Sequence, residues 1–219
     1  VFIDIEDHPF NMDPNLIEAA ITNKTKAILP VSLYGQMPDY DKINEIAEKY
    51  NLVVIEDGAQ SFGGTQNNKK SCGVTKMSTT SFFPTKPLGC YGDGGALFTD
   101  DDDLACKIRA IKAHGGIKRF THEYIGVNSR LDTIQAGILH VKLDNLEECL
   151  ETRNEVALYY SINLKNVPHL KVPEVLSNNT SAWAQYSLIT PSKEIRDYLV
   201  DELKKNKINV AIFYPVPLH

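Results

Sequence analysis

The chain has 219 residues, of which 42% are hydrophobic and 23% are charged, and its formal net charge is −5. These values are ordinary for a globular protein and exclude a disordered chain as the default class. The acidic balance leaves no basic stripe, so we expect no nucleic-acid partner. No apolar run approaches the roughly 20 residues that a membrane-spanning helix needs, so we expect no membrane association.

The first part of the chain alternates short apolar segments with helical segments. Apolar and β-branched runs predict strands over 1–5, 27–32 and 52–55. The proline after Asp13 marks the start of one helix, and a second helix is predicted over 39–50. Strands interleaved with helices in this way are typical of a parallel sheet, so we predict an α/β fold.

The strand predicted over 52–55 is followed by the acidic and small residues of 56–61. Ligands bind at the carboxyl ends of strands in an α/β sheet, so Asp57 is expected to face a ligand, with Gln60 one short turn further on. Taken alone, an acidic pair after a strand is more often a helix cap or a surface turn. The ligand interpretation therefore depends on the segment that follows.

That segment contains a lysine in unusual surroundings. Lys86 follows Ser81, two phenylalanines and a proline, and it precedes a run crowded with glycine over 89–95. Lysine is normally solvated, but a partly desolvated lysine loses its proton more readily and becomes an amine nucleophile. Such an amine forms Schiff bases with pyridoxal phosphate (PLP) or with a carbonyl substrate. A structural lysine in a glycine-rich turn is the alternative from this segment alone.

Strands predicted over 79–83 and 94–99 flank the Lys86 loop. The four acidic residues of 100–103 then open a helix that reaches about His114. Acidic side chains suit the positive end of a helix dipole, so we interpret them as structural and predict no metal site. We expect reduced thiols from four scattered cysteines without paired metal-ligand spacing, which are Cys72, Cys90, Cys106 and Cys149.

The last third of the chain predicts a boundary between two domains. Apolar residues at helical spacing predict one long helix over 131–164. Prolines and polar residues in 165–181 mark a boundary. Beyond it we predict a strand, a helix and a strand, over 185–190, 193–206 and 210–213.

Several motifs occur in a characteristic order. They are Pro-Val-Ser-Leu-Tyr-Gly-Gln at 30–36, Glu-Asp-Gly-Ala-Gln-Ser-Phe-Gly at 56–63, Ser-Phe-Phe-Pro-Thr-Lys at 81–86, Gly-Asp-Gly-Gly at 92–95, Gly-Val-Asn-Ser-Arg-Leu-Asp-Thr-Ile-Gln-Ala at 126–136 and Tyr-Pro-Val-Pro-Leu-His at 214–219. Together they resemble the nucleotide-sugar aminotransferases of the DegT/StrS type, which are fold-type I PLP enzymes. The resemblance covers essentially the whole chain. It implies a mostly parallel sheet in a large PLP-binding domain, residues 1–150, followed by the beginning of a smaller α/β domain, residues 151–219.

The resemblance also implies roles for residues around the cofactor. Lys86 would link covalently to PLP and later move protons as the catalytic residue. Asp57 would pair with the pyridinium nitrogen, and a carboxylate there keeps the ring able to accept electrons. Gln60 would lie near the phenolic oxygen and the ring face. Ser81 would donate its hydroxyl to the PLP phosphate.

Further residues would serve the substrate and a partner subunit. Asn128 would reach the phosphate of the neighbouring subunit's cofactor, which implies a homodimer with shared active sites. Arg130 and Tyr214 are the candidates for substrate contacts, since an arginine fork suits the carboxylate of a sugar acid. The sequence departs from several relatives at Phe213, where they have histidine, so the sugar preference could differ.

A second departure concerns the ends of the chain. Family members carry a Gly-Thr phosphate-binding turn well before the Asp57 segment, and this chain does not contain it. The chain opens at Val1 without a methionine and stops at His219, where the family continues. We therefore expect an internal portion of a longer enzyme.

The motifs are most similar to members that aminate a UDP-linked 3-keto-N-acetylglucosaminuronate. They imply PLP-dependent transamination in the cytoplasm, with glutamate as amino donor, for bacterial surface polysaccharide. Two alternatives stay open, amination at C4 of a UDP-4-keto sugar and a non-catalytic binding or scaffold remnant. Sugar dehydratases of the same family have histidine at the lysine position, so Lys86 argues against them. A lysine Schiff-base aldolase would not need Asp57.

Overall fold

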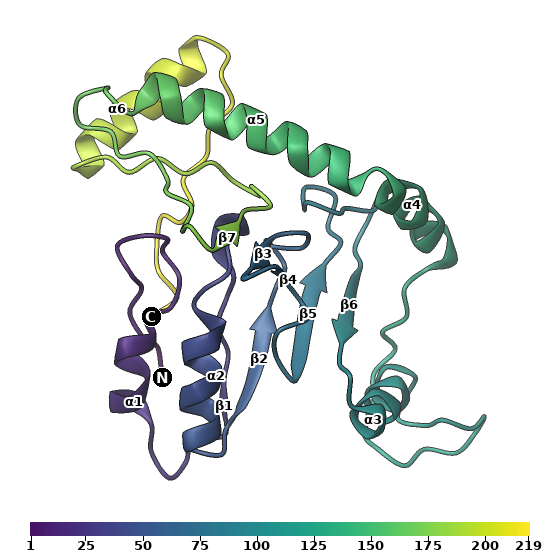
Figure 1. The fold of residues 1–219 in the computed structure, drawn as a ribbon. Coiled ribbons are helices and arrows are strands. Elements are labelled where there is room, and N and C mark those ends of the chain that lie inside the picture. The colour runs from purple at the N-terminus through teal and green to yellow at the C-terminus, as the bar shows by residue number, and fades with distance from the viewer.

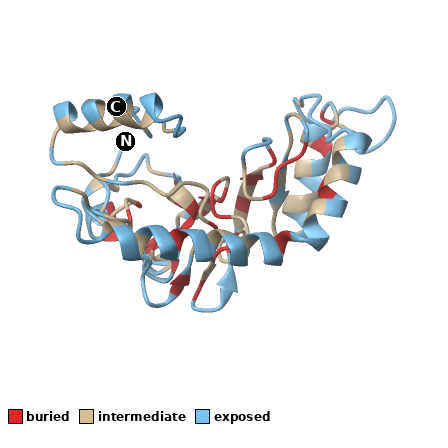
Figure 2. Ribbon diagram, turned by 90° about the horizontal axis from the view of Figure 1, so that it is seen from above, coloured by how far each residue is buried: buried red, intermediate tan, exposed pale blue.

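A computed structural model describes all of residues 1–219 (Figure 1). It combines a central sheet with helices, so the predicted α/β class is confirmed. Buried residues gather in the sheet and the loops around it (Figure 2). No helix combines the length and the apolar composition that a bilayer crossing requires.

The central sheet has four strands in the order β1-β2-β5-β6. They are β1 (Ala27–Ile28), β2 (Val53–Asp57), β5 (Met77–Ser81) and β6 (Gly95–Phe98). Strand β2 runs parallel to both of its neighbours, whereas β6 runs antiparallel to β5. The prediction of a mostly parallel sheet is therefore confirmed, and the carboxyl ends of β2 and β5 lie at the same edge (Figure 1).

Helix α2 (Tyr40–Lys49) packs against the sheet and forms as predicted. Its start is set by Asp39, whose Oδ1 accepts a hydrogen bond from the Lys42 amide at 3.1 Å. Its buried side chains recur every three or four residues, which directs them to one side of the helix. The core they form with neighbouring elements comprises Ile17, Ile28, Met37, Tyr40, Ile43, Ile46, Ala47 and Val54.

Residues 1–5 do not form the predicted strand. One antiparallel bridge pairs Ile5 with Met12, so the segment folds back on itself. Val1 and Phe2 are exposed because no strand of the sheet lies beside them. The helical start after Asp13 is confirmed, as the 3-10 turn η1 (Pro14–Leu16) and the helix α1 (Ile17–Ala20).

Helix α3 (Asp102–Lys112) begins in the acidic run. The Asp101 carboxylate accepts a hydrogen bond from the Leu104 amide at 2.9 Å and forms an ion pair with Lys76 at 3.4 Å. These contacts, the backbone hydrogen bond first, lower the pKa of Asp101. Asp101 therefore has a structural role at the start of α3. No group of three or more His, Cys, Asp or Glu residues is arranged to hold a metal ion.

The single helix predicted over 131–164 is instead two helices, α4 (Thr133–Asp144) and α5 (Leu146–Leu164). Asn145 between them leaves helical geometry at φ −107° and ψ 7°. Its side-chain amide donates to the Val141 carbonyl at 3.0 Å, which satisfies a carbonyl at the end of α4. The apolar periodicity continues across this break, so it could not show the change of direction.

A second, antiparallel sheet has the order β4-β3-β7 and was not predicted. Its strands are β3 (Thr65–Gln66), β4 (Lys69–Lys70) and β7 (Asn179–Thr180). Two-residue strands are too short to give a periodic signal. This sheet nevertheless joins the loop after β2 to the segment after α5.

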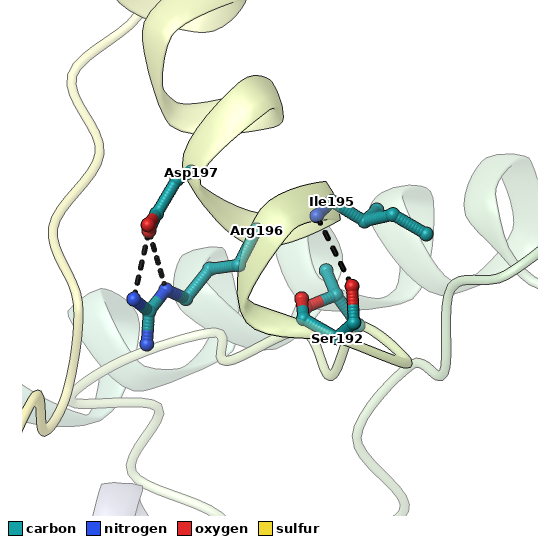
Figure 3. Close-up of polar contacts among 5 residues, drawn as sticks. Ser192, Ile195, Arg196 and Asp197 are labelled. Carbon is teal, nitrogen blue, oxygen red and sulfur yellow. Dashed lines mark hydrogen bonds and ion pairs between the residues drawn. The ribbon is translucent and has the colours of Figure 1, made fainter.

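Of the predicted strand, helix and strand near the C-terminus, only the helix forms. Helix α6 (Lys193–Lys205) starts at Ser192, whose hydroxyl oxygen accepts from the Ile195 amide at 3.4 Å (Figure 3). The predictions of strands over 185–190 and 210–213 are wrong, because the only pairing there is one bridge from Ile189 to Lys171. Extended segments become strands only when another backbone lies beside them to complete their hydrogen bonds. Helix α6 has no buried residue (Figure 2).

Candidate active site

The ends of β2 and β5 bring two of the predicted site residues to one edge of the sheet. Asp57 ends β2 and Ser81 ends β5. Asp57 pairs across the strands with Thr79, two residues before Ser81. At about 3.3 Å per residue, Ser81 lies roughly 7 Å further along β5. Parallel pairing therefore places a carboxylate and a hydroxyl on the same edge.

The backbone of Asp57 is held by Thr79 of β5 on one side and by residues 31–32 on the other. Val31 forms a parallel bridge with it, and the Ser32 amide donates to the Asp57 carbonyl at 3.0 Å. The half-buried carboxylate uses one oxygen, Oδ1, to accept from the Ala59 amide at 3.0 Å. The other oxygen accepts no hydrogen bond within the chain, so it can receive a proton donor from a ligand.

Gln60 is buried and connects three distant segments. Its Oε1 accepts from the Tyr34 amide at 2.6 Å, and its Nε2 donates to the Tyr214 hydroxyl at 3.0 Å. Tyr34 lies in the turn η2 (Leu33–Gly35), and its hydroxyl donates to the Phe213 carbonyl at 2.6 Å. The structure thus brings Gln60 and Tyr214 together, and it adds Tyr34. Sequence reasoning gave Tyr34 no role, although its place in the 30–36 motif could have indicated one.

Lys86 lies in the loop after β5 and is half-buried. The loop is closed by its own hydrogen bonds, from the Lys86 amide to the Phe83 carbonyl at 2.9 Å and from the Phe83 amide to the Ser81 hydroxyl at 3.2 Å. The Lys86 ammonium forms no ion pair or hydrogen bond with any residue of the chain. A half-buried amine without a protein partner is available to a ligand.

The glycine-rich run packs closely against the protein itself. A Cβ on Gly89 would lie 2.7 Å from the Phe83 and Pro84 carbonyl oxygens, and one on Gly94 would lie 2.9 Å from Leu131. The Lys142 ammonium also donates to the Gly89 carbonyl at 2.6 Å. The glycine-rich run therefore lies close to its own loop and to α4, which holds the Lys86 loop in place.

Asn128 and Arg130 bond to each other and not to the residues above. Both are exposed in the segment between α3 and α4, and the Arg130 Nε donates to the Asn128 Oδ1 at 3.1 Å. No hydrogen bond joins either residue to the predicted cofactor residues within one chain.

A cavity of about 700 Å³ lies elsewhere, between α6 and the segments 185–190 and 209–214. Tyr34 and Tyr214 line it, but Asp57, Ser81 and Lys86 do not. Its lining is mostly hydrophobic, with 14 of 21 residues, as a packing surface for polypeptide would be. The candidate active site is therefore the strand edge, because the polar groups with unused bonding capacity are there.

A buried acid, Glu56, was missed by sequence reasoning. It has no exposed surface, and burial raises its pKa above the ordinary value of 4.5. The only sequence signal was its place beside Asp57 at a strand end. Burial also raises the pKa of the nearby Cys72 thiol to about 12, so that thiol stays protonated at neutral pH.

The raised pKa of Glu56 predicts a pH dependence of stability. Between pH 4.5 and the raised pKa, the folded chain keeps a proton that the unfolded chain has lost, so the free energy of unfolding falls as pH rises. The loss is about 1.4 kcal/mol for each pH unit by which the pKa is raised. Urea unfolding at a series of pH values should show Glu56→Gln gaining stability over the wild type through this window. A difference that stays constant with pH would contradict the prediction.

A carboxylate, a hydroxyl and an unpaired lysine on the edge of a mostly parallel sheet define the candidate active site of an α/β enzyme. The chain belongs to the DegT/DnrJ/EryC1/StrS aminotransferase family, whose sequence model matches residues 1–219. The cofactor of these aminotransferases is PLP.

Individual relatives agree with this assignment. The UDP-2-acetamido-2-deoxy-3-oxo-D-glucuronate aminotransferase of Pseudomonas aeruginosa is 51% identical over 219 residues, which are 100% of this chain and 60% of the relative. A DegT DnrJ EryC1 StrS aminotransferase from Brucella abortus has a TM-score of 0.95 at 44% identity, over 100% of this chain and 60% of that one. DesV from S. venezuelae, solved with a ketimine intermediate, has a TM-score of 0.96 at 35% identity, over 100% and 58%. The chain thus spans about 60% of the length of the relatives it matches.

Proposed function

We propose that this chain is the cofactor-binding part of a PLP-dependent aminotransferase that acts on a nucleotide-linked keto-sugar. One observation carries the proposal. Asp57 and Lys86 are half-buried charged groups at one strand edge, and each has bonding capacity that no residue of the chain uses. Partly buried charges normally have partners. A charged, polar ligand at this edge would supply them.

The residues present fit PLP. When bound, PLP supplies an electron sink that stabilises a carbanion at the carbon bearing the amino group. The free oxygen of Asp57 would accept a hydrogen bond from the protonated ring nitrogen and so keep that nitrogen positively charged. Ser81 would donate its hydroxyl to the phosphate, and Gln60 would border the ring through its fixed side chain. The Lys86 amine would hold the cofactor covalently and then carry the proton between two carbons as general base and acid.

Arg130, Asn128 and Tyr214 are proposed to act on the substrate and across a dimer. The Arg130 Nε is engaged by Asn128, while its two terminal nitrogens make no hydrogen bond within the chain. A planar pair of free donors suits a sugar carboxylate. Because both residues are exposed and make no hydrogen bond to Asp57, Gln60, Ser81 or Lys86, we place them in the active site of a partner subunit. Sedimentation of the full-length protein as a monomer would contradict this part of the proposal.

For the substrate, we propose UDP-linked 3-keto-N-acetylglucosaminuronate, with glutamate as the amino donor. The 51% identity to the Pseudomonas enzyme supports this choice. The product would be an amino sugar for bacterial surface polysaccharide. We place the reaction in the cytoplasm, since four free cysteines are typical of a reducing compartment.

Three points stay predictions from the sequence. Amination at C4 of a UDP-4-keto sugar is the alternative activity, and Phe213 bears on that choice because it adjoins Tyr214. A non-catalytic remnant is the alternative outside enzymology. The division into domains 1–150 and 151–219 is retained, and α5 spans its boundary without a break.

The first test is an absorbance spectrum of the protein expressed from its complete coding sequence, mixed with PLP. We expect a visible band from lysine-linked PLP, and its loss on addition of glutamate as the amino group moves to the cofactor. The keto-sugar should then restore the band, and NMR of the product assigns the aminated carbon as C3 or C4. Absence of any band with excess PLP would favour the non-catalytic alternative.

A further inference from the structure

Glu56 lies directly under the candidate active site. It precedes Asp57 in β2, and consecutive strand residues point to opposite faces of a sheet. Asp57 therefore belongs to the ligand edge, whereas Glu56 points into the protein and is fully buried. A buried acid beside a cofactor residue, without a role in the proposed chemistry, requires an explanation.

The Glu56 carboxyl group receives three hydrogen-bond donors. The Ser71 hydroxyl donates at 2.7 Å, the Cys72 amide at 2.9 Å and the Ser32 hydroxyl at 3.3 Å. No lysine, arginine or histidine forms an ion pair with it. Three donors from two separate loops make Glu56 the centre of a buried polar cluster.

The cluster reaches the turn that carries Gln60. The Ser71 hydroxyl lies 2.6 Å from the Ser61 hydroxyl, so Glu56 is linked through Ser71 to the residue after Gln60. The same turn is closed by the Ser61 amide, which donates to the Gly58 carbonyl at 3.2 Å. Glu56 is thus joined to both ends of the 57–61 turn. It is bonded directly to Asp57 in the backbone, and it is linked to Ser61 by hydrogen bonds through Ser71.

Packing against neighbouring loops also restricts the 57–61 turn. A Cβ on Gly58 would lie 2.6 Å from the Cys72 Sγ, so the loop that donates to Glu56 also packs against the turn. On the other side, the Ser32 hydroxyl lies 3.1 Å from the Tyr40 hydroxyl in the main core. The cluster therefore couples the turn to the rigid core of the sheet.

We propose, building on the proposed function, that Glu56 is a positioning residue that fixes the 57–61 turn, and with it the orientation of Asp57 and Gln60 toward the PLP ring. Its contribution is geometric. The three donors can be satisfied by a neutral group, because the Ser71 and Ser32 hydroxyls can rotate to accept instead. Glutamine has the same shape and keeps an acceptor for the Cys72 amide. Leucine fills the volume but removes the acceptor that the three donors share, and it leaves the Cys72 amide unpaired.

The test compares Glu56→Gln, Glu56→Leu and the exposed control Glu48→Ala in the full-length protein. PLP affinity is measured by absorbance titration, and ring orientation by visible circular dichroism of the bound cofactor. We expect Glu56→Gln and Glu48→Ala to stay within twofold of the wild-type Kd with an unchanged dichroic band. Glu56→Leu should weaken PLP binding about tenfold and alter that band, while KM for the keto-sugar changes less than kcat.

Ser71→Ala gives an independent test if Glu56→Leu does not fold, because it removes the hydroxyl that links Glu56 to Ser61 and leaves the Glu56 carboxyl group in place. It should weaken PLP binding about threefold and alter the dichroic band in the same direction. Wild-type affinity and an unchanged band in a folded Glu56→Leu or in Ser71→Ala would overturn the positioning role. Failure of the wild type itself to bind PLP would instead overturn the proposed function, and the inference with it.

Discussion

Replacing Lys86 with alanine should abolish the visible absorbance of protein-linked PLP and reduce turnover by about 10²–10⁴-fold, the range for loss of a positioned acid–base group. The physical reason is that Lys86 is the only lysine on the strand-edge loop, and its amine has no competing partner in the chain. Absorbance and single-turnover rates of the full-length protein with glutamate measure the two effects separately.

Lys118→Ala is the matched control, because Lys118 is an exposed lysine on the loop after α3. It should leave both the absorbance and the rate unchanged. Added methylamine could restore part of the rate in Lys86→Ala, since a free amine can replace the missing base. Full turnover in Lys86→Ala would defeat the assignment of Lys86 as the catalytic residue.

Replacing Ile43 with alanine should lower the free energy of unfolding by about 2–5 kcal/mol, as for other large-to-small core substitutions. Ile43 is 0% exposed and lies at the centre of the core between α2 and the sheet. The loss is a large fraction of the 5–15 kcal/mol that usually separates folded from unfolded domains. Urea unfolding followed by far-ultraviolet circular dichroism measures it.

Glu45→Ala, on the exposed side of the same helix, should change the free energy of unfolding by less than about 0.5 kcal/mol. Both substitutions lie in α2 and both introduce alanine, so the comparison isolates the effect of burial. A loss below about 1 kcal/mol for Ile43→Ala would show that α2 is not the central packing element of this fold.

The candidate site was predictable where it depends on strand direction. Asp57 and Lys86 could be assigned to one edge because parallel strands align their carboxyl ends, and apolar runs revealed those strands. The partners of Gln60 could not be predicted in this way. Tyr34 and Tyr214 lie 26 and 154 residues from it, and no local pattern pairs them. Glu56 was missed for the same reason, since its donors at 32 and 71 come from other loops.

Errors in the predicted fold have a related cause. The strands predicted over 185–190 and 210–213 had suitable residues, but a strand exists only when another backbone completes its hydrogen bonds. The break at Asn145 was invisible because apolar spacing reports which side of a helix is buried and not whether its axis turns. The second sheet escaped because each strand has two residues.

The amino-acid sequence by itself determined the α/β class, the helix starts at Asp13, at Asp39 and within the acidic run 100–103, and the lysine loop, because caps and periodicity act between residues close in the chain. Only the tertiary structure decided which groups at the strand edge keep free bonding capacity and which become buried partners. That distinction depends on hydrogen bonds and desolvation between segments that folding alone brings together. Glu56 and Asp57, adjacent in sequence, show it most directly, since one is enclosed by three donors and the other remains open to a ligand.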